Sequence, residues 1–291
     1  MVRLRRANAG SIDEADIVVI GVPDESKSHA RRKGTSRAPD VLRMASNEFE
    51  FFERGSKIIP TCPMRGSLEG KRVFDAGNIA DKQKLYKIVS DLAYAGKLPI
   101  MIGGDHSLTT ETIKAVAAAA GKTSGENKIS LLYFDAHPDF VSSVRDYYGS
   151  VLTDSASSID FGKSMLIGTR AAEPEEIKNA KAAGLKIVTP LDIAEFGVNK
   201  VSQMIKARTT GSKIYISVDL DCVDPSSAPG VSVPSSAGLS AVDLIYLLNK
   251  VISGGNVAGI DIVELTPEYD INGMTAMLAA KILSECIAAV E

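Results

Sequence analysis

Four short segments of the sequence carry side chains that can bind a metal ion, and each directly follows an apolar run of strand length. The side chains are histidine, aspartate and glutamate, with no cysteine among them. Groups of this kind bind the harder divalent ions or transfer protons. In chain order they are His106; then Asp135, His137 and Asp139; then Asp219 and Asp221; and finally Glu264.

The segment ISLLYFDAHPD, residues 129–139, is the densest of the four. Its first six residues predict a buried strand, and Asp135, His137 and Asp139 follow at alternate positions. Alternate side chains of a strand point to one side, so we expect the three to converge just past the carboxyl end of the strand. For this segment alone, a strand followed by an ordinary polar turn is the alternative interpretation.

The other three segments repeat the arrangement. His106 follows two glycines at a strand-to-helix turn, where glycine permits a sharp change of backbone direction. Asp219 and Asp221 stand two residues apart after the run 213–218, and Glu264 ends the last run. Each has a structural explanation in isolation, such as a capped histidine. Their recurrence at four strand ends favours one shared site at the carboxyl edge of a sheet.

Strand and helix patterns alternate along the whole chain, without a low-complexity linker or a repeat of fixed period. This alternation predicts an α/β fold, a single domain over residues 1–291, with a mostly parallel sheet and helices on both faces. Strands are predicted at 16–22, 73–77, 99–103, 129–134, 163–170, 185–189, 213–218 and 257–263. Helices are predicted at 40–52, 81–96, 108–120, 173–184, 193–207, 241–252 and 275–290.

Two polar segments interrupt this alternation. Residues 23–39 contain His29 and several basic residues, and they form either a solvated loop or a lid over a site. Residues 141–158, with Tyr147, Tyr148 and several serines and aspartates, are predicted to be a surface loop.

The bulk properties exclude several classes of protein. The net charge is -3, from 33 basic and 36 acidic residues, which gives no electrostatic case for a nucleic-acid partner. Cys62, Cys222 and Cys286 lack the paired spacing of a disulfide framework or a zinc ribbon. The basic N-terminal segment lacks the apolar run of a signal peptide, and no stretch reaches the ~18 apolar residues of a membrane span. We therefore expect a soluble, cytoplasmic protein.

Four carboxylates and two imidazoles are more ligands than one tetrahedral zinc uses. Mixed oxygen and nitrogen ligation without thiolates favours Mn²⁺, and shared carboxylates can bridge two ions roughly 3.5–4 Å apart. Without a cation, the carboxylates would repel one another severely at the edge of the sheet. Glu264 is surplus to this set, and an additional carboxylate at such a site suggests a small cationic substrate such as a guanidinium.

The motifs GGDHS, FDAHPD, SVDLDCVDP and DIVELTP, in this order, resemble the signature blocks of the ureohydrolase (arginase/agmatinase) family. The likeness extends to GVP in the first strand, GTSRAP, IGTR at 167–170 and APG at 228–230, so it covers nearly the whole chain. The IGTR block before an acidic helix and the short chain are more similar to agmatinases than to arginases. The resemblance implies a three-layer α/β/α sandwich, two Mn²⁺ per chain, and a homotrimer or homohexamer.

The resemblance also implies a role for each motif residue. Asp139 would orient the attacking hydroxide in addition to binding metal, and Glu264 would bind the guanidinium. The reaction would release urea and an amine, as in the hydrolysis of agmatine to putrescine. One ion would be held by His106, Asp135, Asp139 and Asp219, and the other by His137, Asp135, Asp219 and Asp221.

The chain departs from the family in one catalytic detail. Ureohydrolases usually have a histidine in the loop after the DAHxD block, thought to carry a proton to the leaving amine, but residues 141–158 contain none. The best local match places Asp154 there, either as an acid in its place or as an inert loop residue. His29, Asp139 or water are the other routes for the proton.

A second departure affects the substrate. GVSVPSSAG at 230–238 stands where agmatinases tend to have GTGTPE, and it is more similar to formimidoylglutamases. Hydrolysis of formimidoylglutamate or of another guanidino acid is therefore the alternative activity. A catalytically weak homologue that keeps its metals for structure or regulation is the alternative outside the enzyme class.

Overall fold

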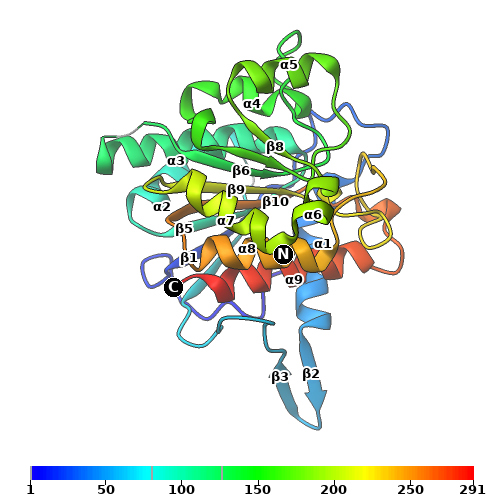
Figure 1. Ribbon diagram of the computed structural model, residues 1–291. Coiled ribbons are helices and arrows are strands. Elements are labelled where there is room, and N and C mark those ends of the chain that lie inside the picture. Colours follow the sequence, from blue (N-terminus) through cyan, green and yellow to red (C-terminus); the bar gives the residue numbers. More distant parts are fainter. Residues whose placement is uncertain (1, 80, 126) are drawn as a thin grey trace.

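The computed structural model describes residues 2–79, 81–125 and 127–291. Its centre is an eight-stranded sheet with the order β4-β1-β5-β10-β9-β6-β7-β8, in which neighbouring strands pair in parallel (Figure 1). The strands are β1 (Ile17–Gly21), β4 (Val73–Asn78), β5 (Leu98–Ile102), β6 (Ser130–Phe134), β7 (Met165–Ile167), β8 (Lys186–Val188), β9 (Ile214–Asp219) and β10 (Val257–Val263).

Helices cover both faces of the sheet, which confirms the predicted α/β/α sandwich. One face is covered by α1 (Ala38–Phe49), α6 (Pro190–Phe196), α7 (Val198–Thr209), α8 (Ala241–Ile252) and α9 (Met274–Ala289). The other is covered by α2 (Leu85–Tyr94), α3 (Thr109–Ser124), α4 (Val151–Asp154) and α5 (Pro174–Ala182). Among the described residues, no helix is long and apolar enough to cross a membrane.

Strand β6 shows why its sequence is a continuous apolar run. Leu132 and Phe134 belong to the core on one face of the sheet, while Leu131 and Tyr133 belong to the core on the other. A strand buried on both faces needs large side chains at successive positions, so alternation with polar residues is absent.

The order of the strands concentrates the chemistry-bearing segments. From β5 the chain crosses to β6 and leaves a gap, which β9 and β10 fill only later. The four strands that precede the motif residues, β5, β10, β9 and β6, are therefore consecutive neighbours. Because all four are parallel, their carboxyl ends lie at the same edge, where open α/β sheets bind their ligands.

The predicted helix at 40–52 is wrong at its C-terminal end. Helix α1 stops at Phe49, and β2 (Phe51–Arg54) pairs antiparallel with β3 (Lys57–Pro60) in a hairpin. Gly55, with a φ of 63°, supplies the left-handed turn between the two strands. Figure 1 shows the hairpin projecting from the body of the molecule.

The predicted helix at 193–207 is interrupted. Gly197 has a φ of 80°, which a right-handed helix does not accommodate, so it ends α6 and precedes α7. The helical spacing of apolar residues continues on both sides of Gly197, so the sequence pattern does not reveal the break.

The segment 141–158 was predicted to be a surface loop; residues 142–146 are exposed, as predicted, but the part around 150–155 is largely buried. It forms short helical turns, and Val151, Leu152 and Thr153 are buried. The Leu152 N–H donates to the Asp139 carbonyl (3.0 Å), and the Thr153 hydroxyl donates to the Val141 carbonyl (2.7 Å). The segment is thereby folded back against the carboxyl edge of the sheet.

Candidate metal centre

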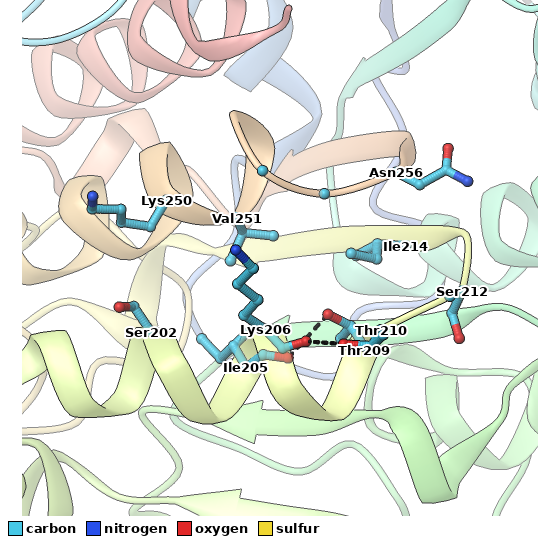
Figure 2. Close-up of a pocket in the computed structure, with 13 residues that line it drawn as sticks. Ser202, Ile205, Lys206, Thr209, Thr210, Ser212, Ile214, Lys250, Val251 and Asn256 are labelled. Atoms are coloured by element: carbon cyan, nitrogen blue, oxygen red, sulfur yellow. Dashed lines mark hydrogen bonds between the residues drawn. The ribbon is translucent and has the colours of Figure 1, made fainter.

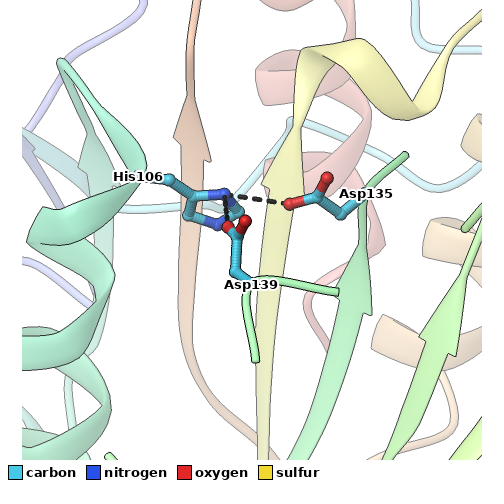
Figure 3. Close-up of side chains that lie close together, drawn as sticks. All are labelled: His106, Asp135 and Asp139. Carbon is cyan, nitrogen blue, oxygen red and sulfur yellow. Dashed lines mark ion pairs between the residues drawn. The ribbon is translucent and has the colours of Figure 1, made fainter. Parts of the chain in front are cut away.

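One nitrogen of His106 collects three carboxylates. His106 lies in the short 3₁₀ helix His106–Leu108, which follows β5. Its Nδ1 atom is 3.0 Å from Asp135 Oδ2, 3.2 Å from Asp139 Oδ2 and 3.1 Å from Asp219 Oδ2. Figure 3 shows Asp135 and Asp139 approaching the imidazole from separate directions. All four residues are buried.

A second group adjoins the first through Asp135. His137 Nδ1 is 3.1 Å from Asp221 Oδ2 and 3.5 Å from Asp135 Oδ1. Asp135 thus directs one oxygen towards each histidine. The structure therefore brings together all six residues that the sequence predicts as metal ligands, as two groups with a shared carboxylate.

The convergence near Asp135 arises from a turn rather than from strand alternation. Strand β6 ends at Phe134, and Asp135 Oδ1 then accepts a hydrogen bond from the His137 N–H (2.6 Å). Asp139 has a φ of 48°, a left-handed conformation that is costly for a residue with a side chain. Backbone strain of this kind accumulates at functional sites.

A relay behind His106 fixes its protonation. Asp261 Oδ1 accepts a hydrogen bond from the Ser217 hydroxyl (2.6 Å), so that hydroxyl is free to accept from His106 Nε2, 2.8 Å away. The proton of a neutral imidazole therefore resides on Nε2, and Nδ1 presents its lone pair to the carboxylates. Such a carboxylate-linked histidine is typical of metal ligands.

The donor set requires a cation. A lone pair of His106 and three carboxylate oxygens face one point, and Asp135 Oδ2 is buried there without a hydrogen-bond donor. Burial and neighbouring Asp221 raise the pKa of Asp135 to about 6. Against the opposing effect of burial, Asp221 and Asp135 raise the pKa of His137 to about 12. These residues fit metal ions. A cation between them would give the buried Asp135 oxygen a partner and would offset the repulsion among the carboxylates.

Glu264 lies next to this cluster, immediately after β10. Its Oε1 accepts from the His106 N–H (2.7 Å), and its Oε2 accepts from the Ser232 hydroxyl. The residue is buried and has a φ of 67°, the second left-handed residue at the site. Burial, followed by the charge of Asp105, raises the pKa of Glu264 to about 8.

Three residues that support the cluster, directly or through a neighbour, were not identified from the sequence. Ser217 and Asp261 form the relay described above, and both lie within apolar strand runs. Tyr133 lies in another such run, where it was assigned only to the core. Its ring stacks on His106 (centroids 4.6 Å apart), and its hydroxyl donates to Asp139 Oδ2 (2.6 Å). The face of the strand on which each of these residues lies determines that its side-chain oxygen points towards the site, and the sequence alone does not give that face.

The two remaining candidate acids lie elsewhere. Asp154 accepts hydrogen bonds from the Asp146 N–H (2.8 Å), the Ser150 hydroxyl (2.5 Å) and Arg145 (3.3 Å), which hold its own loop together. Within residues 2–79, 81–125 and 127–291, no hydrogen bond or ion pair joins it to the six ligands. His29 is exposed and stacks on Tyr147, with ring centroids 5.1 Å apart.

The 23–39 segment packs against the turn that carries His106. The Asp105 N–H donates to the Asp24 carbonyl (3.0 Å). A Cβ atom at Gly104 would lie 1.8 Å from that carbonyl oxygen, so only glycine fits there. The structure therefore favours the second interpretation of this segment, as a cover beside the site.

Comparison with known proteins agrees with this geometry. Residues 15–289 match the model of the Arginase family. Proclavaminate amidinohydrolase of Streptomyces clavuligerus is 29% identical over 94% of this chain and 87% of its own. Agmatinase of Neisseria meningitidis serogroup C is also 29% identical, over 94% of this chain and 86% of its own.

The fold is equally similar. The crystal structure of agmatine ureohydrolase of Thermoplasma volcanium superimposes with a TM-score of 0.81 and 29% identity, and the match covers 99% of this chain and 94% of the other. The resemblance identified from the sequence motifs is thereby confirmed, and the chain belongs to the arginase family.

Proposed function

We propose that the chain is a binuclear manganese amidinohydrolase that hydrolyses agmatine to putrescine and urea. The observation that carries this proposal is the pair of adjoining histidine–carboxylate groups with Glu264 beside them. The similarity to proteins named agmatinase supports the choice of agmatine.

The metal assignment rests on the ligand types. His106, Asp135, Asp139 and Asp219 would hold one ion, and His137, Asp135, Asp219 and Asp221 the other. Six oxygen- and nitrogen-bearing side chains without a thiolate favour Mn²⁺ over a structural zinc. When bound, two such ions lower the pKa of a shared water towards neutrality and so supply a nucleophile.

The protein's own groups would position the substrate around that nucleophile. A carboxylate offers about four lone-pair directions. Glu264 uses two of them for the His106 N–H and the Ser232 hydroxyl, so one direction on each oxygen stays available for a bidentate pair with a guanidinium. Asp139, held by the Tyr133 hydroxyl, would orient the nucleophile and accept its proton.

One feature favours a guanidino acid as the second candidate substrate. Arg32 Nη1 lies 3.2 Å from the Pro229 carbonyl and 3.4 Å from the Val231 carbonyl. The next residue, Ser232, bonds to Glu264. A cationic side chain beside this segment would attract the carboxylate of a guanidino or formimidoyl acid and repel the distal ammonium of agmatine.

A substrate panel with Mn²⁺-loaded protein tests the proposal. Urea release would be measured with agmatine, arginine and 4-guanidinobutyrate, and formamide release with formimidoylglutamate. Highest kcat/KM on agmatine supports the first proposal, and a preference for either acid supports the second. For the acids, Arg32→Gln should lower kcat/KM, whereas Arg31→Gln, an exposed neighbour, is the matched control. Two bound ions without any product would indicate a homologue with a structural or regulatory metal site.

We further propose a cytoplasmic homotrimer or homohexamer. Large apolar side chains are exposed on α6 and α8 of one layer, with Leu191 at 79%, Phe196 at 50% and Val242 at 69%. Such residues on the surface favour association. Light scattering on the eluting protein would determine the mass, and a monomer across the working concentration range would contradict this assembly.

A further inference from the structure

The IGTR motif contains none of the proposed metal ligands, yet it is bonded to the turn that carries two of them. Its arginine, Arg170, donates its backbone N–H to the Ala136 carbonyl (2.9 Å). Ala136 lies between Asp135 and His137, and its own N–H donates to Asp221 Oδ1 (3.0 Å). The motif therefore adjoins the His137 group, which consists of Asp135, His137 and Asp221.

The guanidinium of Arg170 binds backbone carbonyls of two different segments. In the turn that follows β9, Nη2 donates to the Asp221 carbonyl (2.8 Å) and Nη1 to the Cys222 carbonyl (3.2 Å). In a second segment, Nε donates to the Ser236 carbonyl (2.9 Å) and Nη2 to the Ser235 carbonyl (2.6 Å). One planar cation thus joins a turn that carries a proposed metal ligand to the segment that contains the two serines.

That second segment, residues 230–238, also reaches the carboxylate proposed to bind the substrate. The Ser232 hydroxyl donates to Glu264 Oε2. Beside this contact, Val231 and Leu265 form an isolated antiparallel bridge, which aligns the backbones of the two segments. Arg170 therefore binds one end of a segment whose other end supports the carboxylate of Glu264.

The two segments held by Arg170 are packed closely where they meet. A Cβ atom at Gly238 would lie 2.7 Å from Arg170 Nη2 and 2.4 Å from the Asp224 backbone nitrogen. The Gly238 N–H donates to Asp224 Oδ2 (3.0 Å), and Val223 pairs with Leu239 in an isolated parallel bridge. A movement of the turn after β9 would therefore displace the end of the segment 230–238 as well.

We propose that Arg170 is a positioning residue that couples the binding of the second metal ion to the binding of substrate by Glu264. This inference rests on the proposed amidinohydrolase function. Arginine suits the role because its planar fork directs five N–H donors to several carbonyls at once, whereas a lysine ammonium is one flexible point. Without the fork, the turn of Asp221 and the segment of Ser232 lose their common partner, so both the metal ligand and the support of Glu264 become less well ordered.

The test uses two variants of Arg170 and a matched control elsewhere in the fold. Arg170→Lys keeps the charge but loses the fork, and Arg170→Gln loses both. The control is Arg208→Lys, because the Arg208 guanidinium likewise joins separate segments, with donation to the carbonyls of Ser164 (2.8 Å), Phe161 (3.2 Å) and Gly184 (2.6 Å). None of these three residues belongs to the metal centre.

Each metal-free protein would be titrated with Mn²⁺ by calorimetry, and electron paramagnetic resonance would follow the spin coupling between two bound ions. Turnover of the best substrate of the panel would then be measured at saturating Mn²⁺, with Tm in parallel. Arg170→Lys, the milder change, decides the outcome if Arg170→Gln does not fold.

We expect both Arg170 variants to bind the second ion about 10–100-fold more weakly, so that spin coupling appears only at higher Mn²⁺, while affinity for the first ion stays within ~3-fold of wild type. At saturating Mn²⁺, KM should remain about 10-fold higher and kcat within ~3-fold, because the ligands and Glu264 are present but less well held. Arg208→Lys should lower Tm and leave both metal affinities and KM unchanged.

Second-ion affinity within ~3-fold of wild type in Arg170→Lys, or an equal loss in Arg208→Lys, would overturn the role of Arg170. A weakened second ion with an unchanged KM would overturn the coupling to Glu264. Wild-type protein that binds two ions but turns over no substrate of the panel would instead refute the proposed function, while the metal titration would still decide whether Arg170 positions the second ion.

Discussion

The carboxyl and amino edges of the central sheet differ in the way their polar groups are satisfied. At the carboxyl edge, buried carboxylates and imidazoles crowd together within 3.0–3.5 Å. At the amino edge, two hollows of about 360 and 720 Å³ open between the loops that precede the strands. Figure 2 shows the smaller one, bordered by α7 and α8, with Lys206 and Lys250 on its walls.

Two hydroxyl groups that line the smaller amino-edge hollow bond to their own helix. The Thr209 and Thr210 hydroxyls donate to the Ile205 and Lys206 carbonyls of their own helix end, at 2.9 and 2.8 Å. Among the described residues, buried side-chain atoms without a hydrogen-bond partner belong to Glu50, Ser130, Asp135 and Glu285. None of these lines either hollow, whereas Asp135 is at the centre of the carboxyl edge. A buried carboxylate oxygen without a hydrogen-bond partner, rather than a large volume, distinguishes the carboxyl edge from the amino edge.

Of the substitutions considered, one at Asp219 should have the largest effect on bound metal and activity. Asp219→Ala should lose much of the bound manganese, because this carboxylate would bridge both ions, and activity should fall by ~10³-fold or more, since a metal ion supplies several kcal/mol of transition-state stabilisation. Elemental analysis and kcat would report the two losses. The matched control is Asp16→Ala at the amino edge, where an exposed ion pair with Arg72 contributes little. A single tightly held zinc, unaffected by Asp219→Ala, would refute the binuclear site.

Glu264→Gln should have the next largest effect. The amide removes the negative charge that pairs with a guanidinium, which costs on the order of 2–4 kcal/mol, or roughly 30- to 1000-fold in kcat/KM. Metal content should stay near two ions per chain, because Glu264 is outside the ligand set. Equal kcat/KM of wild type and variant on the preferred substrate would show that the substrate is held by another group.

Asp261→Asn should act through the histidine tautomer. Asp261 Oδ2 accepts from the Thr109 and Tyr215 hydroxyls (2.9 and 2.7 Å), so the amide oxygen would take that side and its NH₂ would face Ser217. The serine would then accept rather than donate, and its proton would turn towards His106 Nε2. Proton and lone pair would exchange places on the imidazole, and metal affinity should fall by about 10–100-fold.

A metal titration of Asp261→Asn alongside Thr109→Val separates this effect from a general loss of packing. Thr109→Val removes one hydrogen bond to Asp261 but leaves the bond from Ser217 in place. Metal affinity that is unchanged in both variants would mean that the relay does not set the tautomer.

The sequence was sufficient to predict the carboxyl edge as a whole. Strands buried on both faces produce long apolar runs, and a polar residue directly after such a run must lie at a strand end. The alternation of strands and helices then required a parallel sheet, which places all these ends at one edge. His106 and Glu264 were assigned to one site in this way although 158 residues separate them.

The residues that sequence analysis missed have a common physical reason. Tyr133, Ser217 and Asp261 lie inside the runs, where hydrophobicity dominates and polar ends are read as part of the core. Their roles depend on which face of β6, β9 and β10 they occupy and on whether that face lies next to His106.

Asp154→Ala should have only a small effect on catalysis. Its carboxylate accepts from the Asp146 N–H and the Ser150 hydroxyl, so its loss should loosen the loop by about 1–2 kcal/mol and lower Tm by a few degrees. We expect kcat to stay within ~3-fold of wild type. A fall of 10²-fold with an unchanged Tm would restore Asp154 as the proton donor.

The smallest effect is expected at the amino edge itself. Lys206→Ala removes a charge from the wall of the smaller hollow, but its side chain neither pairs with a buried carboxylate nor reaches the carboxyl edge, which lies at the other end of β9. Its backbone carbonyl, which accepts from Thr210, is retained in the variant. Metal content and kcat/KM should therefore equal those of wild type, and Lys250→Ala should behave alike. A change in kcat/KM without a change in Tm would mean that the amino-edge hollow is coupled to the metal centre through β9, and the contrast between the two edges would then fail.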